Sequence, residues 1–375
     1  MRILVASWPG YGHLLPMVPL IRAAQRRGAE IVVSTGADLG PVVEGLGVRA
    51  HRSGVTLAES YARMPAVVGE LPPEEQPLFA ARHFFGAGAV DRGRDIAALL
   101  DGWRPDLVVH DILELGAPAA AKALGIPHVT HGYGPTVPDT DRFAQVIGQT
   151  VGESDLPDPI PSVLAAPYLD PCPPSLRGPE PLPWTDVRPI RASAGEPVGA
   201  APDLESSPHA ETVYLTLGTV TNRNVEVFRA VLDGLRRLPL TIVVTTGPDL
   251  DPAVLGPQPP AVVALRFVSQ ALVLPHCALV VSHAGAGTML GAACHGLPQL
   301  CLPQGTDQPP NTTALLRTGA GLALWPGEVT AEAVEAAVTR LLSEPSFRSA
   351  AQGLRAEIEA APEADEVLDA LWPPG

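Results

Sequence analysis

Lysine is almost absent from this sequence, and aromatic residues make up only 5% of it. Of the 25 basic residues, Lys122 is the single lysine. It lies in an Ala-rich segment that predicts a helix, so we expect it on a helix surface. A mechanism that depends on a Schiff-base lysine therefore has one poor candidate, and the lack of a Gly-x-x-x-x-Gly-Lys-Ser/Thr motif excludes a P-loop.

Cysteine is also rare. The four cysteines are Cys172, Cys277, Cys294 and Cys301. They form no C-x-x-C pair, so neither a zinc knuckle nor a disulfide framework is indicated, and we expect a reduced, cytoplasmic protein. Pro9, Gly10 and Gly12 interrupt the apolar N-terminal run, which argues against a signal peptide, and no stretch is apolar enough to span a bilayer.

Positive charge is scarce as well, and the formal net charge is −15. A surface of this sign does not attract nucleic acid or anionic lipid, so neither is expected as a partner. Any phosphate must then be held by local groups. The length of 375 residues fits about two domains of about 150 residues each, and 46% hydrophobic residues suit a packed core in both.

Short apolar runs alternate with segments of helical periodicity along most of the chain. In the first half, strands are predicted at 2–7, 29–35, 106–110 and 127–131, with helices at 14–27 and 114–124. In the second half, strands are predicted at 212–217, 240–245, 261–267, 278–282, 299–302 and 321–324, with helices at 223–237, 287–295, 307–317 and 330–342. Nearly continuous apolar strands separated by helices indicate parallel sheets covered on both faces.

The periodicity fades between about 157 and 208, where proline is frequent. We place the linker in the later part of this stretch and predict domains at 1–200 and 206–375. The last helix can pack back on the first domain. The fold class is α/β, with two doubly wound, Rossmann-like domains facing across a cleft. Ligands of such sheets bind outside the carboxyl ends of the strands, so residues just after strands are the candidates.

The first candidate pair is His13 and Asp111, which follow two strands of the first domain. His13 lies at the start of a helix, which disfavours the imidazolium, so the neutral ring could accept a proton from a hydroxyl. Asp111 could bind the other ring nitrogen and set the tautomer. As alternatives, His13 could cap a helix or be structural, and Asp111 could cap the helix near Ile112. Gly10 and Gly12 could belong to a dinucleotide fingerprint, but its third glycine and its acidic residue are missing.

The second candidate is the turn His283-Ala284-Gly285-Ala286-Gly287-Thr288, between a strand and a helix. Bare backbone N–H groups and the helix dipole favour an anion there, and His283 and Thr288 can add donors. A diphosphate could thus be bound without lysine. The alternative is a tight turn that simply needs small residues.

Two further acidic sites follow strands. Asp307 and Gln308 could bind vicinal hydroxyls of a sugar, although Asp307 could equally be an N-cap. Asp249-Leu250-Asp251 has the form of a metal-binding D-x-D, but its Gly-Pro-Asp-Leu-Asp-Pro setting is ordinary turn composition, so no metal is expected.

Together these segments resemble the family 1 glycosyltransferases of the GT-B fold, and among them the bacterial antibiotic type, such as the calicheamicin and macrolide glycosyltransferases. The resemblance covers nearly the whole chain. Its most specific part is the turn at 283–288 followed by Pro303-Gln304-Gly305-Thr306-Asp307-Gln308. Other matching segments are Gly12-His13-Leu14-Leu15-Pro16, Pro105-Asp106-Leu107-Val108 with Asp111, Pro167-Tyr168-Leu169-Asp170, Pro173-Pro174-Ser175-Leu176, Val187-Arg188-Pro189 and Tyr214-Leu215-Thr216-Leu217-Gly218-Thr219.

The resemblance implies roles for the candidates. His13 would be the general base with Asp111 as its partner, the first domain would bind the acceptor, and the second would bind the nucleotide sugar. Phe267 and Val268 would flank the nucleotide base, and Asp307 and Gln308 would face the sugar. The residues implied at the diphosphate are Thr219, with Gly218 beside it, and His283, Gly285, Ala286, Gly287 and Thr288.

The implied function is metal-independent, inverting transfer of a deoxysugar to a hydroxyl of a hydrophobic polyketide, enediyne or macrolide aglycone. The longer nucleotide segment of plant enzymes is lacking, which favours TDP over UDP in the donor. An acceptor pocket is expected from Trp8 and from the apolar residues Tyr61, Met64, Phe79, Phe84 and Phe85, with the alternative that each of them belongs to the core. A homodimer is compatible with the sequence. The alternatives are a GT-B-like sugar-nucleotide epimerase and a non-catalytic partner of another glycosyltransferase.

This chain departs from the family pattern at two places. Ala284 replaces the second residue of the common His-Gly-Gly, a small change that should leave the turn intact. Pro309-Pro310 follows Asp307-Gln308, where the family often has an aromatic and then a polar residue, and this should stiffen the helix start.

Overall fold

The computed structural model describes residues 1–64, 75–137, 140–204, 207–218, 224–248 and 250–372, without the side chains of 76, 77 and 140–143. The described residues form two parallel sheets. The first has seven strands in the order β3-β2-β1-β4-β5-β6-β7, and the second has six in the order β10-β9-β8-β11-β12-β13. This confirms the predicted α/β fold class of two doubly wound sheets.

The strands of the first sheet are β1 (Arg2–Ala6), β2 (Glu30–Thr35), β3 (Arg49–Arg52), β4 (Leu107–Asp111), β5 (His128–His131), β6 (Tyr168–Asp170) and β7 (Val187–Pro189). The helices that precede β8 in the chain are α1 (Tyr11–Leu14), α2 (Val18–Arg26), α3 (Gly40–Gly45), α4 (Leu57–Ala62), α5 (Gln76–Ala81), α6 (Gly88–Gly102), α7 (Gly116–Leu124), α8 (Thr140–Gly152), α9 (Ile160–Ala165) and α10 (Pro174–Arg177). A π-helical segment, Arg82–Ala87, joins α5 to α6. Lys122 is exposed on α7, as predicted.

The strands of the second sheet are β8 (Thr212–Thr216), β9 (Thr241–Thr245), β10 (Val262–Leu265), β11 (Cys277–Ser282), β12 (Gln299–Cys301) and β13 (Gly321–Ala323). Its helices are α11 (Val225–Leu235), α12 (Gln270–Val273), α13 (Ala286–Cys294), α14 (Gln308–Thr318), α15 (Ala331–Ser343) and α16 (Pro345–Ala360), and the last helix is α17 (Ala364–Leu371). Among the described residues, no helix combines the length and the apolarity that crossing a membrane requires.

Both sheets are buried on both faces, which explains their uninterrupted apolar strands. In the first sheet, Ile3 and Val5 of β1 pack in one cluster with α2, whereas Leu4 joins α6 and α7 in the cluster on the other face. In the second sheet, Val213 of β8 packs with α11 and α15, and Tyr214 packs on the opposite side. Each strand thus alternates between two cores.

Strands β6 and β7 lie within the proline-rich stretch, where periodicity predicts none. Each has three residues, and β7 ends on Pro189 at the edge of the sheet. Such short strands carry too few residues for an apolar period, and an edge position tolerates proline.

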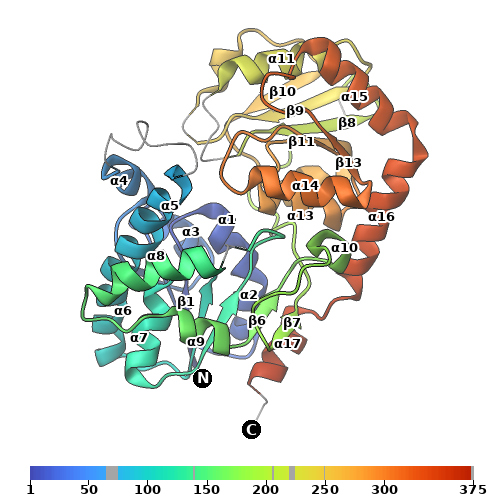
Figure 1. Ribbon diagram of the computed structural model, residues 1–375. Helices are drawn as coiled ribbons and strands as arrows, with labels where there is room; N and C mark the ends of the chain where they lie inside the picture. The colour runs from blue at the N-terminus through green and yellow to red at the C-terminus, as the bar shows by residue number, and fades with distance from the viewer. Residues whose placement is uncertain (65–74, 138–139, 205–206, 219–223, 249, 373–375) are drawn as a thin grey trace.

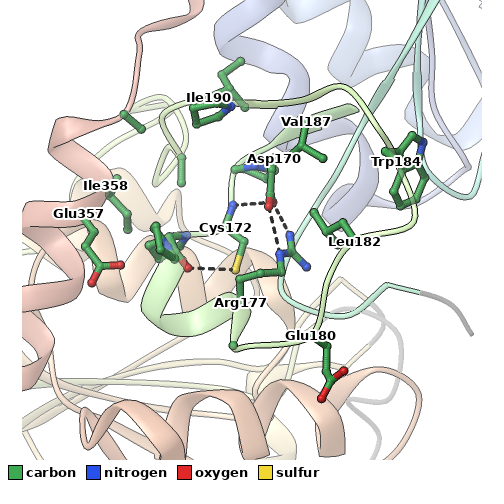
Figure 2. Close-up of a pocket in the computed structure, with 17 residues that line it drawn as sticks. Asp170, Cys172, Arg177, Glu180, Leu182, Trp184, Val187, Ile190, Glu357 and Ile358 are labelled. Carbon is green, nitrogen blue, oxygen red and sulfur yellow. Dashed lines mark hydrogen bonds and ion pairs between the residues drawn. The ribbon is translucent and has the colours of Figure 1, made fainter. Parts of the chain in front are cut away.

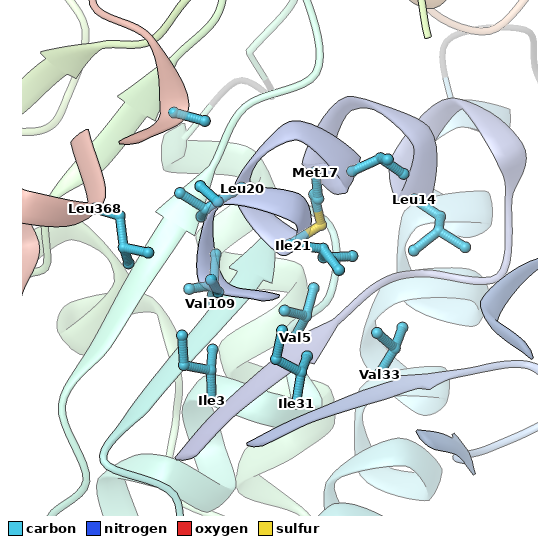
Figure 3. Close-up of a cluster of buried hydrophobic side chains, with 14 of the residues drawn as sticks. Ile3, Val5, Leu14, Met17, Leu20, Ile21, Ile31, Val33, Val109 and Leu368 are labelled. Atoms are coloured by element: carbon cyan, nitrogen blue, oxygen red, sulfur yellow. The ribbon is translucent and has the colours of Figure 1, made fainter. Parts of the chain in front are cut away.

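The last helix packs on the first sheet's layer. Figure 1 shows the chain running from α16 down one side of the molecule to α17. Ala364, Val367 and Leu368 enter the same buried cluster as α2 (Figure 3). At the surface, Arg27 pairs with Asp369 at 2.8 Å. Helix α17 is therefore part of the hydrophobic core that covers one face of the first sheet.

We predict that Leu368→Ala will lower the free energy of unfolding by about 2–5 kcal/mol, because it leaves a cavity at a fully packed site. Leu368 is 1% exposed. The measurement is urea denaturation. Ala370→Ser, at an exposed position of the same helix, should change stability by about 0.5 kcal/mol or less. Equal effects of the two substitutions would contradict the docking of α17.

Candidate active site

His13, Asp111 and the turn 283–288 lie at the switch points of the two sheets. In the first sheet, β1 and β4 are neighbours and pair up to Ala6 and His110, so that the chain after β1 and the end of β4 meet at one edge. In the second sheet, β8 and β11 pair up to Thr216 and Ser282. A sheet of this kind opens a binding crevice where the strand order reverses. Figure 1 shows α1, which carries His13, and α13 where the two halves of the molecule meet.

His13 and Asp111 are in direct contact. The Nδ1 atom of His13 lies 3.0 Å from Oδ1 of Asp111, and the two side chains are 15% and 1% exposed. Asp111 is held from two more directions. The Trp8 N–H donates to Oδ2 at 2.5 Å, and the Leu113 N–H donates to Oδ1 at 2.9 Å. The carboxylate thus occupies Nδ1 and leaves Nε2 as the imidazole nitrogen for a substrate proton.

The environment of Asp111 keeps it ionised. Burial raises the pKa of its carboxyl, but the imidazole of His13 and the N–H groups of Trp8 and Leu113 outweigh burial and hold the pKa below its usual value. The contact to Leu113 shows that Asp111 binds the backbone of the turn after β4, but α7 begins only at Gly116, so Asp111 does not cap a helix near Ile112.

Aromatic rings surround His13. The Trp8 ring lies 5.1 Å from the imidazole, and the Tyr133 ring lies 4.8 Å from it on another side. Phe84 and Phe85, on the π-helical segment, lie 6.3 and 5.8 Å from Trp8. Of the other residues predicted to line an acceptor pocket, Tyr61 contacts Phe84 at 5.0 Å, whereas Phe79 and Met64 are half-buried. The structure therefore places Trp8, Phe84 and Phe85 in one aromatic cluster beside the candidate base, and Tyr61 contacts this cluster through Phe84.

In the second domain, the His283 imidazole lies between two glycines. A Cβ atom added at Gly218 or at Gly285 would come within 2.5 or 2.3 Å of its Nε2 atom. Burial lowers the pKa of His283 to about 4, so the ring is neutral at physiological pH and carries one N–H. Thr219 lies outside the described residues.

The turn continues into α13 with exposed backbone. Ala284 adopts the left-handed conformation with φ of 65°, and Gly285 is the N-cap of α13. The turn stays intact with alanine, as predicted, but in a conformation that glycine adopts at lower cost. Beyond it, Ala286 is buried and Gly287 is exposed. Nε2 of Gln270 donates to Oγ1 of Thr288 at 2.8 Å, so the Thr288 hydroxyl keeps its own proton for another acceptor.

Asp307 and Gln308 differ in their contacts with the loop before α14. Asp307 stands at the N-cap position, but its side chain makes no capping hydrogen bond, which rules out the N-cap alternative. Gln308 is 3% exposed, and its Oε1 accepts from the N–H groups of Gln304 and Gly305 at 2.7 and 3.2 Å. Gln308 thus shapes the loop, and Asp307 is left partly exposed.

The remaining predicted positions lie at strand ends. Phe267 follows β10 and is 56% exposed, with its ring 6.5 Å from that of Tyr11 in the first domain. Val268 is buried in the core beside β8.

The D-x-D segment also follows a strand. Asp251 caps the short helix Pro252–Leu255 by accepting from the Ala253 N–H, and it pairs with Arg266. Asp249 lies outside the described residues. Within the described parts of the chain, no group of three or more His, Cys, Asp or Glu side chains is arranged to hold a metal ion.

Family models match both halves of the chain. Residues 82–218 match the N-terminal domain model described as "Erythromycin biosynthesis protein CIII-like", and residues 229–372 match its C-terminal counterpart. The L-demethylnoviosyl transferase of Streptomyces niveus is 35% identical, over 86% of this chain and 85% of the relative. The elloramycin glycosyltransferase ElmGT of Streptomyces olivaceus is 30% identical, over 99% and 97%. The chain belongs to the EryCIII-like glycosyltransferases.

Solved structures of such enzymes share the whole fold. The spinosyn rhamnosyltransferase SpnG aligns with a TM-score of 0.82 and 26% identity, over 99% of this chain and 100% of the other. The glycosyltransferase SsfS6 of Streptomyces sp. SF2575, complexed with thymidine diphosphate, aligns with a TM-score of 0.79 and 26% identity, over 99% of both chains. The GT-B fold and glycosyltransferase activity are thereby established for this chain, as the sequence predicts.

One loop of this glycosyltransferase, 132–136, connects the two halves of the site. It follows β5 and brings Tyr133 to His13. Its Gly134 lies against Ala286 at the start of α13, where an added Cβ would come within 2.4 Å of the Ala286 Cβ. The loop is therefore packed between the candidate base and the candidate diphosphate turn.

A buried ion pair binds the backbone of the loop 132–136. Arg177 pairs with Asp170 through both carboxylate oxygens and donates to the carbonyl oxygens of Gly134 and Pro135. Figure 2 shows this pair at the wall of a cavity of about 420 Å³, which lies between the segment 170–192 and α16. Trp184 and Ile358 also line the cavity. The cavity is separate from His13, so the ion pair supports the site without lining it.

Sequence reasoning missed Tyr133, Gln270 and Asn311. Tyr133 comes two residues after a predicted strand, so the same rule that selected Asp111 could have selected it. Gln270 lies on α12 and meets the site only through a tertiary contact, to Thr288, and no local signal in the sequence marks it. Asn311 lies one helical turn after Asp307 and binds it directly, so the spacing of four residues is a local signal that could have selected it.

We predict that Gly134→Ala will lower the free energy of unfolding by about 1–3 kcal/mol, because the new methyl group must displace α13 or the loop. Chemical denaturation measures the change. Gly353→Ala is the matched control, since Gly353 lies within α16 with nothing within 4 Å of an added Cβ and its replacement should stabilise the helix slightly. An unchanged stability of Gly134→Ala would contradict the packing of the loop against Ala286.

Proposed function

We propose that this glycosyltransferase transfers a deoxysugar from a TDP-sugar to a hydroxyl group of a hydrophobic natural product, with inversion, and that His13 is its general base. The observation that carries the proposal is the contact of Asp111 with Nδ1 of His13. The choice of a TDP-sugar as donor is supported by the structures of SsfS6 and of the glycosyltransferase VinC, which were solved with thymidine diphosphate. Relatives named as desosaminyl and mycaminosyl transferases support a deoxysugar.

The contact between Asp111 and His13 supports a direct proton transfer from the acceptor hydroxyl to His13. The acceptor hydroxyl gives its proton to Nε2 of His13 while its oxygen forms a bond to the anomeric carbon. Asp111, being ionised and buried, stabilises the positive charge that the imidazole gains. The bond from the anomeric carbon to the diphosphate oxygen breaks in the same step. One in-line displacement of this kind inverts the anomeric centre.

The leaving diphosphate carries negative charge to the start of α13. The backbone N–H groups at Ala286, Gly287 and Thr288 belong to the first turn of this helix and have no partner within it. They and the helix dipole can stabilise the leaving group without a lysine or a metal. The acceptor would bind beside His13 against the aromatic cluster of Trp8, Phe84 and Phe85, of which Phe85 is half-buried and the other two are buried.

His13→Ala should reduce turnover by about 10²–10⁴, because general-base assistance is lost, while the affinity for TDP stays unchanged. Mass spectrometry of reactions with TDP-glucose, TDP-rhamnose, UDP-glucose and a panel of polyketide aglycones measures transfer, and calorimetry measures TDP binding. Full turnover of the variant would refute the role of His13. Consumption of the sugar nucleotide without an acceptor would instead favour an epimerase.

Asp111→Asn is expected to lower kcat by about 10²–10⁴, since an amide at this place no longer stabilises the imidazolium and can hold the ring in the wrong tautomer. The amide is close in size to the carboxylate, so the fold should persist, and the melting temperature serves as the control for this. A kcat close to that of the wild type would show that Asp111 has only a structural role.

A further inference from the structure

The side chain of Asn311 joins three parts of the site. Its Nδ2 group donates to Oδ2 of Asp307 at 2.8 Å and to the carbonyl oxygen of Ala284 at 3.1 Å. Its Oδ1 atom accepts from the hydroxyl of Thr136, in the first domain, at 2.6 Å. Asn311 is 0% exposed. A reversed amide would place oxygen against two acceptors, so these contacts fix its orientation.

Asp307 depends on this contact for its orientation. Its side chain does not cap α14, because Gln308 satisfies the N–H groups of the preceding loop. Within the described residues, Oδ1 of Asp307 accepts from the hydroxyl of the neighbouring, exposed Thr306 at 3.1 Å, whereas Oδ2 is bound to the buried Asn311. A carboxylate that binds sugar hydroxyls needs one oxygen fixed and the other accessible, and this arrangement supplies both.

The Thr136 contact links the donor carboxylate to the acceptor domain. Thr136 ends the loop 132–136, whose Tyr133 lies beside His13. Asp307 also contributes to the raised pKa of Tyr133, after burial, which is the larger cause. Packing alone would be satisfied by an apolar side chain at position 311, since a buried amide is costly unless all its hydrogen bonds are made.

We propose that Asn311 is a positioning residue for the transfer reaction: it orients the Asp307 carboxylate toward the sugar of the donor and, through Thr136, ties that carboxylate to the domain that carries the base. The proposal rests on the function proposed above. It assigns to Asn311 a role in recognising the sugar and none in binding the nucleotide.

The decisive measurement compares the affinity for TDP with that for the TDP-sugar of highest kcat/KM in the donor panel. In Asn311→Ala, the affinity for the TDP-sugar should fall about tenfold, since a hydrogen bond to a charged group is lost, while the affinity for TDP stays within about twofold. Asp307→Ala should show the same pattern, and the double variant should be no worse than Asp307→Ala. Thr313→Ala, at an exposed position of α14, is the matched control and should leave both affinities unchanged.

Thr136 provides a second test that leaves Asp307 and Asn311 in place. Thr136→Val should lower kcat about three- to tenfold with little change in TDP affinity, because Oδ1 of Asn311 loses its donor, and Thr136→Ser should restore kcat. In thermal unfolding without ligand, the melting-temperature losses of Thr136→Val and Asn311→Ala should be non-additive, as expected for two ends of one hydrogen bond.

Three results would overturn the proposal: equal losses of TDP and TDP-sugar affinity in Asn311→Ala, a further loss when Asn311→Ala is added to Asp307→Ala, or additive effects on unfolding. Failure of the proposed function looks different, because the wild type would then transfer no sugar from any TDP donor. The unfolding cycle still decides in that case whether Asn311 and Thr136 are coupled.

Discussion

The carboxylate of Asp111 is the group on which the candidate site depends. A buried carboxylate is stable only when its oxygens are bound, and here an imidazole and two backbone N–H groups bind them. These donors come from the turn after β1 and from the turn after β4. The same contacts therefore align two strand ends, place the His13 ring and determine which of its nitrogens is free. The geometry of the proposed proton transfer would thus follow from the requirement to satisfy one buried charge.

The proposed donor site would bind an anion with uncharged groups. The chain has a single lysine among its 25 basic residues and a net charge of −15, so it has almost no lysine with which to bind a diphosphate. Its second domain instead presents the start of α13, the neutral imidazole of His283 and glycines that keep the backbone bare. Such fixed dipoles do not have to reorganise when charge develops on a leaving group.

The loop 132–136 makes the two sides interdependent. Tyr133 of this loop lies beside His13, Gly134 packs against α13, and Thr136 donates to Asn311. Arg177 donates to the carbonyl oxygens of Gly134 and Pro135. A small displacement of this loop would therefore move both His13 and Asn311, which binds Asp307. Such coupling suits the proposed reaction, in which two substrates bound by different domains would have to meet in line.

Most strands of the two sheets, the glycine-rich turn and the candidate residues His13 and Asp111 were predictable from the sequence, because apolar period and local turn chemistry are encoded within a few residues. Strands β3, β6 and β7 were not, since three or four residues carry too short a period, and helices α6 and α16 were not predicted either. The inward turn of Gln308 was not foreseen either, because only the loop amides of the folded chain draw its side chain away from solvent. Asn311 acquires its partners from Thr136, Ala284 and Asp307, two of them far away in the sequence. The sequence by itself thus determined which residues stand at the strand ends, and the tertiary structure alone decided which of them touch, because contacts between distant segments exist only after the sheets and domains have packed.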